Sequence, residues 1–347
     1  MRATRPVRPA LSRGALALAL AAVALGASGC TTRLGIFLPF VNGAVGTPEI
    51  TTEARALGVH TIRFSQDVTA PVRANFAAFS RNGLGVVVDF HNHPQPDANG
   101  HNVSHPPDTP SELATYRAQA AATLDGMPRP VLVQVENEEN STTYFQGAMS
   151  DYVNELNATV AVAHARGTQV TNGGITSRPA VLLAWQDYED RGLHAQADDL
   201  AARVFARAPQ ILADLRRRPF AGLTNQALQA AWDRAEQLIP VYRASSMDDV
   251  NFHWYEDDSR ALGEVVDFLR RATGKPVVTT EIGQHDTDPG VVDAHLQTAV
   301  VQERLPVVVW FDADGLPAMG LHDAPGVLRA NGEVFKAFVA GHDDIVD

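Results

Sequence analysis

The chain has 347 residues, of which 45% are apolar and 20% charged, as in a globular protein with a sizeable core. Its net charge is −12, and the first 29 residues hold four arginines and no acid, so the remainder is more acidic still. Nucleic-acid binding needs a basic surface. The charge therefore argues against a nucleic-acid partner and suits a neutral ligand.

The N-terminal residues resemble an export signal. A basic segment (1–13) precedes a short apolar one (14–26), which is too short to span a membrane. Small residues then lead to Cys30, the only cysteine, and this arrangement resembles a bacterial lipoprotein signal. The resemblance implies cleavage before Cys30, a lipid on its thiol and anchoring of the exported protein to the cell envelope. Ordinary secretion with an incidental cysteine is the alternative.

Beyond residue 29, short apolar and β-branched runs alternate with helical patterns. Such nearly continuous apolar runs are typical of strands that helices cover on both faces. Eight strands are predicted, over Leu34–Phe40, Thr61–Phe64, Gly85–Phe90, Val131–Val135, Thr168–Thr171, Val250–Trp254, Pro276–Thr280 and Pro306–Phe311.

The helical patterns between these runs are amphipathic or rich in alanine. They predict helices over Pro48–Leu57, Val72–Asn82, Ser111–Leu124, Met149–Arg166, Ser259–Thr273, Val291–Glu303 and Asn331–Ala340. Eight β-then-α repeats predict an α/β fold, a closed (β/α)8 (TIM) barrel. A doubly wound open sheet is the alternative, but the chain contains no glycine-rich phosphate loop.

Residues 185–246 depart from this regular alternation. They contain at least two helical patterns between the fifth and sixth strands, which is far more than one crossover helix. We expect a helical insertion packed on the barrel rim. Without a linker or repeat, residues 30–347 are predicted to form one domain.

Polar and aromatic residues gather where the predicted strands end. Barrel enzymes place their catalytic groups at the carboxyl ends of strands. Two acids stand out there, Glu138 after the fourth strand and Glu281 after the seventh. Cleavage of a glycosidic bond needs two carboxyl groups, one to protonate the leaving oxygen and one to attack the sugar or activate water. Arg63, after the second strand, would keep Glu281 ionised.

The set resembles clan A of the glycoside hydrolases, most closely the cellulase-type family 5. That pattern has Arg after strand two, His after strand three, Asn-Glu after strand four, His-x-Tyr after strand six, Glu after strand seven and Trp after strand eight. These types fall on Arg63, His91, Asn137-Glu138, His253-Trp254-Tyr255, Glu281 and Trp310. The string VQVENE also resembles the acid/base segment of family 35 β-galactosidases. The insertion lies outside the pattern, so the resemblance does not imply a particular sugar.

The resemblance implies a role for each matching residue. Glu138 would be the acid/base and Glu281 the nucleophile, with Tyr255 and Arg63 orienting Glu281. The remaining positions would bind a β-linked glycan: Asn137 at the sugar 2-hydroxyl, His91 and His253 at the cleavage subsite, and Trp310 as a stacking face. Opposite strands of a barrel would place the two carboxyl groups roughly 5 Å apart, the spacing of a retaining mechanism. No cofactor or metal is required, and the sequence indicates no oligomeric state.

Two other functions stay open. His91-Asn92-His93, with His101 and His105 nearby, could ligate zinc in a metal-dependent hydrolase. A non-catalytic sugar-binding lipoprotein could keep the same barrel and cleft. Glu136 and Glu139 flank the predicted acid/base, but only Glu138 directly follows an asparagine.

Overall fold

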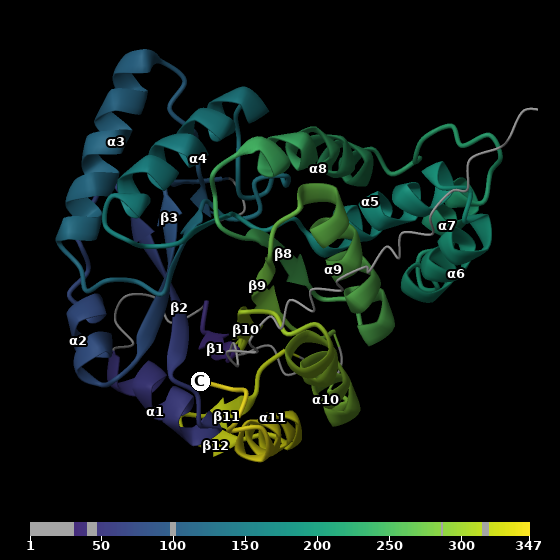
Figure 1. Ribbon diagram of the computed structural model, residues 1–347. Helices are drawn as coiled ribbons and strands as arrows, with labels where there is room; N and C mark the ends of the chain where they lie inside the picture. The colour runs from purple at the N-terminus through teal and green to yellow at the C-terminus, as the bar shows by residue number, and fades with distance from the viewer. Residues whose placement is uncertain (1–30, 40–46, 98–101, 286, 314–318) are drawn as a thin grey trace, which may run out of the picture.

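The computed structural model describes residues 31–39, 47–97, 102–285, 287–313 and 319–347, and its central feature is a parallel barrel (Figure 1). Eight parallel strands form one sheet in the order β7-β6-β3-β2-β1-β10-β9-β8. They are β1 (Arg33–Phe37), β2 (Thr61–Asp67), β3 (Gly85–His91), β6 (Leu132–Val135), β7 (Val170–Asn172), β8 (Val250–Trp254), β9 (Val277–Ile282) and β10 (Val307–Phe311). Each predicted strand is confirmed with ends shifted by a few residues, and Phe40 lies outside the described residues.

The sheet closes on itself, which excludes the open-sheet alternative. The first and last strands pair in parallel, with Arg33 opposite Val307. The outer strands β7 and β8 meet through isolated bridges, Thr171 to Asp249 and Ile175 to Phe252. The side chain of Asn172 completes this seam, because its Nδ2 donates to the carbonyl of Asn251 at 3.0 Å.

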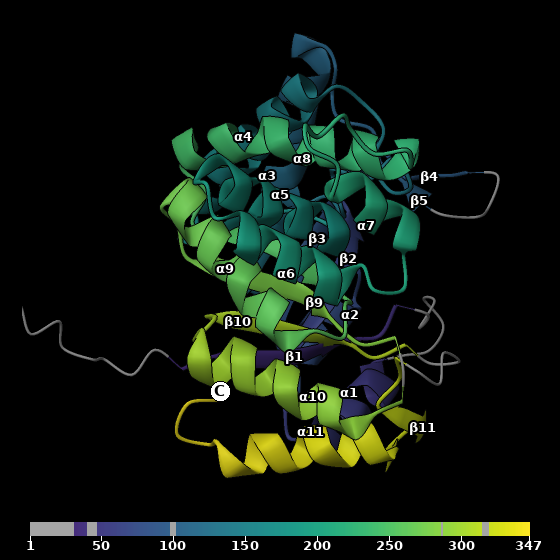
Figure 2. The same ribbon diagram turned by 90° about the vertical axis from the view of Figure 1, so that its right-hand side faces the viewer.

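Helices surround the barrel (Figures 1 and 2). The helices outside the insertion are α1 (Thr47–Leu57), α2 (Asn75–Arg81), α3 (Pro110–Asp125), α4 (Met149–His164), α9 (Ser259–Thr273), α10 (Pro289–Leu296), a π-helical continuation (Gln297–Gln302) and α11 (Ala330–Gly341). These confirm the predicted helices, except that 291–303 changes from α- to π-helical. Two short antiparallel pairs complete the chain, β4 (Gln95–Pro96) with β5 (Asn102–Val103) and β11 (His322–Ala324) with β12 (Val327–Leu328).

The segment between β7 and β8 is helical, as predicted, and extends to one side of the barrel (Figure 1). It consists of α5 (Ser177–Asp190), α6 (His194–Val204), α7 (Pro209–Leu215) and α8 (Gln226–Ala244). The predicted start at residue 185 lies inside α5. No helix in the described ranges is long and apolar enough to cross a membrane.

Alternation along each strand separates two apolar regions. Outward residues such as Ile36, Ile62 and Val88 pack under the helices in the main core. Inward residues form a smaller cluster inside the barrel: Val87, Leu132, Val278, Val307 and Val309. This plug fills the lower barrel, as layered side chains do in such folds. Polar inward residues nearer the carboxyl ends of the strands line a pocket at that end of the barrel.

Candidate active site

A pocket of about 850 Å³ opens at the carboxyl ends of the barrel strands. Seven of the nine predicted site residues come together in and beneath it. Arg63, His91, Asn137, Glu138, Tyr255 and Glu281 line the pocket, while His253 is fully buried and contacts both glutamates from below. Trp310 lies elsewhere, and Cys30 lies outside the described residues.

Arg63 joins three neighbouring segments. Its guanidinium bonds the carboxylate of Glu281, and its Nη2 lies 2.8 Å from Asp89 Oδ2 and 2.7 Å from Asn137 Oδ1. The side chain is buried and lies over the ring of Phe37, 4.4 Å from its centroid. A planar guanidinium can bond several acceptors in fixed directions. Arg63 therefore sets the positions of Glu281 and Asn137 together.

Glu281 reaches the pocket through an irregularity in β9. The pairings Asn251–Val278 and His253–Glu281 enclose one more residue on β9 than on β8, which is a β-bulge. A bulge changes the alternation of a strand and re-aims its side chains. As a result, Thr280 and its neighbour Glu281 both reach His253, at Nε2 (3.2 Å) and Nδ1 (3.4 Å).

The surroundings of Glu281 favour its ionised form. Burial raises the pKa of a carboxyl group. His253 and Arg63 outweigh that effect, together with a hydrogen bond of 2.5 Å from the hydroxyl of Tyr255, and they lower the pKa of Glu281 below its ordinary value. The carboxylate is thus a charged group held between fixed donors.

Glu138 lies across the pocket from Glu281, and its surroundings raise the pKa of its carboxyl group. Its backbone follows β6 in the left-handed region, with φ of 49°, a conformation that is uncommon for non-glycine residues. Burial raises the pKa of its carboxyl group, and the hydrogen bond to His253 Nδ1 at 3.0 Å offsets this only in part. One carboxyl oxygen of Glu138, one of Glu281 and a ring nitrogen of His253 all lie within 4.8 Å of one another.

The other two acids after β6 have structural contacts. Glu136 accepts a hydrogen bond from the backbone of Asn92 at 2.8 Å, which fixes the loop after β3. Glu139 bonds the hydroxyl of Tyr242 on α8 and Nδ2 of Asn172 at 2.9 Å. Both are fully buried, so Glu138 alone of the three faces the pocket.

The two predicted histidines occupy different layers. His91 lines the pocket and contacts Asp89 through Nε2 at 2.9 Å and Ser104 through Nδ1 at 3.2 Å. Burial lowers its pKa, but the carboxylates of Asp89 and Glu136 outweigh burial and raise it to about 10, so His91 carries a positive charge. His253 lies against Gly174, where any Cβ would collide with its ring.

Trp310 does not line the pocket, and its predicted role as a stacking face is wrong. Val307, Val309 and Phe311 are the inward residues of β10, so Trp310 points outward between them. It is fully buried against Phe335 of α11, with ring centroids 6.0 Å apart. The apolar face that β10 presents to the pocket is Phe311.

Several pocket residues escaped prediction. Asp89 was read only as part of a strand end, although it bonds both Arg63 and His91. Tyr144 comes from the long loop after β6. The insertion supplies one wall, with residues 176–179 at the start of α5 and Leu228 and Ala231 of α8. A buried arginine and histidine need a carboxylate partner, which is the signal that could have found Asp89. No sequence signal indicates which helix of the insertion turns toward the pocket.

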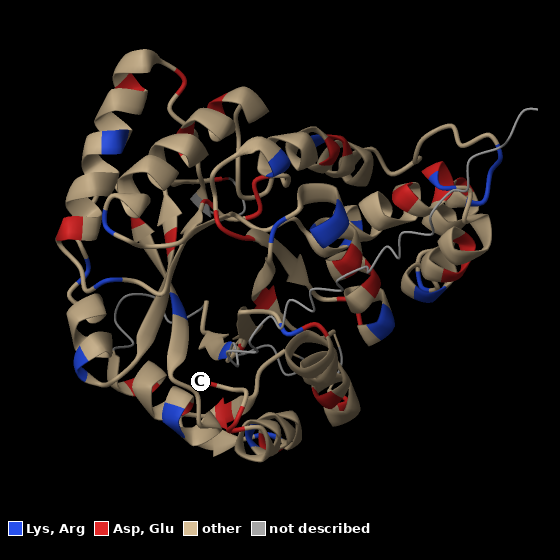
Figure 3. Ribbon diagram, in the orientation of Figure 1, with Lys and Arg blue, Asp and Glu red and all other residues tan. Residues whose placement is uncertain are grey.

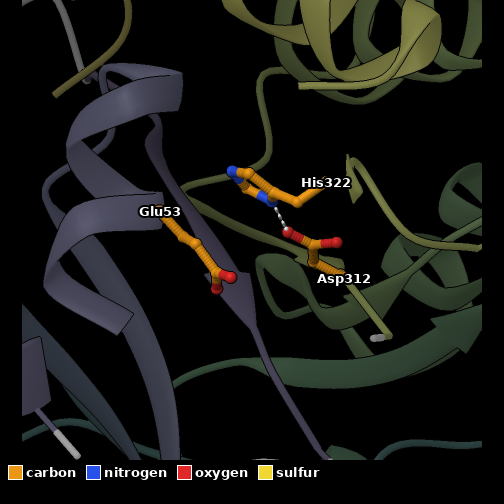
Figure 4. Close-up of side chains that lie close together, drawn as sticks. All are labelled: Glu53, Asp312 and His322. Carbon is orange, nitrogen blue, oxygen red and sulfur yellow. Dashed lines mark hydrogen bonds and ion pairs between the residues drawn. The ribbon is translucent and has the colours of Figure 1, made fainter. Parts of the chain in front are cut away.

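Two groups in the described ranges have the spacing of metal ligands: Glu138–His253–Glu281 and Glu53–Asp312–His322. In the second, the three buried side chains converge from α1, the end of β10 and β11 (Figure 4). His322 Nδ1 lies 2.5 Å from Asp312 Oδ2, and Asp312 Oδ1 accepts from the backbone of Leu321 at 2.6 Å. These bonds account for the closeness of Asp312 and His322.

The predicted zinc alternative finds no support among the described residues. Nε2 of His91 contacts Asp89 and Nδ1 contacts Ser104, whereas His93 and His105 are exposed to solvent. His101 lies outside the described residues. Neither His93 nor His105 belongs to a described group with metal-ligand spacing.

Comparison with known proteins finds similarity in structure only. No family model and no curated protein matches the sequence. Fungal β-1,4-galactanases have a TM-score of 0.53 at 11% identity, covering 88% of this chain and 99% of theirs. A family 30 endoxylanase from Clostridium papyrosolvens C71 has a TM-score of 0.51 at 12% identity, covering 89% and 72%. A family 26 β-mannanase from Bacteroides ovatus has a TM-score of 0.50 at 12% identity, covering 91% and 90%. The likeness establishes a fold shared with glycoside hydrolases.

Because Trp310 points outward from β10 and Phe311 points inward, substitution of Trp310 should affect stability and substitution of Phe311 should affect the pocket. Trp310→Phe should lower the free energy of unfolding by about 1–3 kcal/mol, since it leaves a gap in the core, and should leave the KM of a reaction in the pocket unchanged. Phe311→Leu should raise KM with little loss of stability. Chemical denaturation and steady-state kinetics measure the two quantities. A raised KM for Trp310→Phe with native stability would contradict the assignment.

Proposed function

We propose that this protein is a retaining glycoside hydrolase that cleaves β-glycosidic bonds in an oligosaccharide or polysaccharide. The observation that carries the proposal is the pair Glu138 and Glu281, which share one pocket with carboxyl oxygens within 4.8 Å. Retaining enzymes hold their two carboxyl groups about 5–5.5 Å apart, whereas inverting enzymes need about 6.5–9.5 Å to admit a water. The fold shared with galactanase, xylanase and mannanase structures supports the reaction class.

The opposite pKa shifts of the two acids support the proposed roles. The pKa of Glu138 is raised and that of Glu281 is lowered, so between the two pKa values the pair holds one proton, on Glu138. Separated pKa values of this kind distinguish an acid from a nucleophile. Glu138 is accordingly the proton donor and Glu281 the attacking carboxylate.

In the first step, a Glu281 oxygen bonds to the anomeric carbon and the glycosidic C–O bond breaks. The bond's electron pair goes to the leaving oxygen, which takes the proton of Glu138. In the second step, the now ionised Glu138 removes a proton from water, and the water oxygen attacks the anomeric carbon and releases Glu281. In this proposal Asn137, held by Arg63, bonds the sugar 2-hydroxyl, as the resemblance implies, and Phe311 contacts the ring face.

Substitution of each carboxylate should give a distinct kinetic signature. Glu281→Gly should lower kcat by several powers of ten, and azide should restore turnover of an aryl β-glycoside with inverted product. Glu138→Ala should slow natural glycans far more than dinitrophenyl glycosides, because an activated leaving group needs little proton donation. A panel of β-glucosides, β-galactosides, β-mannosides and β-xylosides serves as substrates.

Glu333→Gln is the matched control, since it changes an exposed acid on α11 that lines neither the pocket nor its surroundings. It should retain the leaving-group dependence of the native protein. Near-native activity of Glu281→Gly would exclude the proposal. Binding of glycans without turnover by the native protein would favour the sugar-binding alternative instead.

We also propose that residues 1–29 are removed on export, that residues 30–347 form the mature domain, and that a lipid on Cys30 anchors it to the cell envelope. The support is the sequence alone, because this segment lies outside the described residues. The native protein should partition into detergent with membranes, and Cys30→Ser should stay in the aqueous phase or remain unprocessed. An unmodified Cys30 in the mass spectrum of the membrane-extracted protein would contradict the anchor.

A further inference from the structure

A second cavity of about 760 Å³ adjoins the pocket. The two share the lining residues Arg178, Glu256 and His285, so they lie side by side, and the ion pair of Arg178 with Glu256 (3.1 Å) stands where they meet. We call the second part the distal cleft. A pocket of 300–1,000 Å³ already accommodates a drug-sized ligand. The two cavities together therefore have room for more than the sugar units on either side of one bond.

The distal cleft lies between the helical insertion and the barrel rim. One wall is the end of α6 with the turn that follows it, residues 203–208, and the other is the loop from Glu256 into α9. Arg203 joins the walls, since its guanidinium lies 2.7 Å from Asp258 Oδ1 and 2.5 Å from Glu264 Oε2. These bonds fix the width of the cleft before any ligand arrives, and a preformed site binds at a lower entropic cost.

Charged side chains of both signs line the distal cleft. They are Arg178, Arg203, Arg207, Arg260, Glu256, Asp257 and Asp258. Figure 3 shows acidic and basic residues together on α6, α7 and α9. No tryptophan, tyrosine or phenylalanine lies among the lining residues. With four arginines against three carboxylates, the lining favours neither an anion nor a cation strongly, and it offers many donors and acceptors to hydroxyl groups.

We propose that the distal cleft binds further sugar units of an uncharged glycan, so that the protein cleaves within an extended chain rather than at its end. The inference rests on the proposed function, because the chain must pass through the pocket of Glu138 and Glu281. Its basis is that the two cavities adjoin and share lining residues, and that the second is lined by side chains that can hydrogen-bond hydroxyl groups. The helical insertion thereby becomes the element that selects long substrates.

Arg207 gives the sharpest test. Its side chain is 84% exposed and its ion pair with Asp257 is long, 3.7 Å, so Arg207→Ser should leave the fold intact. Arg216→Ser is the matched control, because Arg216 is exposed on the same insertion and lines neither cavity. The substrates are end-labelled β-1,3- and β-1,4-linked glucan, mannan, xylan and galactan oligosaccharides of two to six units, together with an aryl monoglycoside.

For the linkage that is cleaved, kcat/KM of the native protein should rise with each added unit, and the labelled hexasaccharide should be cut internally. Arg207→Ser should lose about five- to tenfold in kcat/KM on the hexasaccharide, the value of about one hydrogen bond, and less than about twofold on the aryl glycoside. Arg216→Ser should match the native protein on both.

The two proposals fail in different ways. Cleavage with no dependence on chain length, or an equal loss in Arg207→Ser and Arg216→Ser, would overturn the distal cleft and leave the glycosidase intact. Release of single units from the chain end would do the same. A native protein that hydrolyses neither the oligosaccharides nor the aryl glycoside would overturn both.

Discussion

The buried guanidinium of Arg63 balances the negative charge of the pocket. It bonds Glu281 and Asp89, two acids on different strands, and Asp89 in turn bonds the charged ring of His91. A buried charge is tolerated only when it is paired, and loss of one partner leaves the others uncompensated. Without Arg63, Glu281 and Asp89 would lose a shared cation and Asn137 its anchor. The lowered pKa of Glu281, and with it the proposed assignment of nucleophile and acid, depends on this contact together with His253 and Tyr255.

The barrel also gives the two carboxyl groups of the pocket separate environments. Glu138 follows β6 and Glu281 ends β9, so different strands and different neighbours determine their pKa values. His253 touches both groups from β8 and links them at the floor of the pocket. Two local departures from regular backbone make this possible: the left-handed conformation of Glu138 and the bulge in β9.

The strands and most helices could be predicted because their periodicity is local. The strand-end rule brought together Arg63, His91, Asn137, Glu138, Tyr255 and Glu281, since parallel strands end at one rim. The prediction for Trp310 was wrong because a shift of one residue along a strand moves a side chain from the inner to the outer face. The sequence does not show that register. The wall made by α5 and α8, like the bulge that turns Glu281 inward, depends on contacts between distant segments that no local pattern records.

The configuration of the first product tests the two-carboxylate account most directly. Proton NMR during hydrolysis of whichever β-glycoside the protein accepts distinguishes the anomer released from the one formed later by mutarotation. Double displacement at a pair of carboxyl groups this close predicts that the β-anomer appears first. An α-anomer appearing first would require a water between Glu138 and Glu281, and it would contradict both the spacing of the pair and the role of Glu281 as nucleophile.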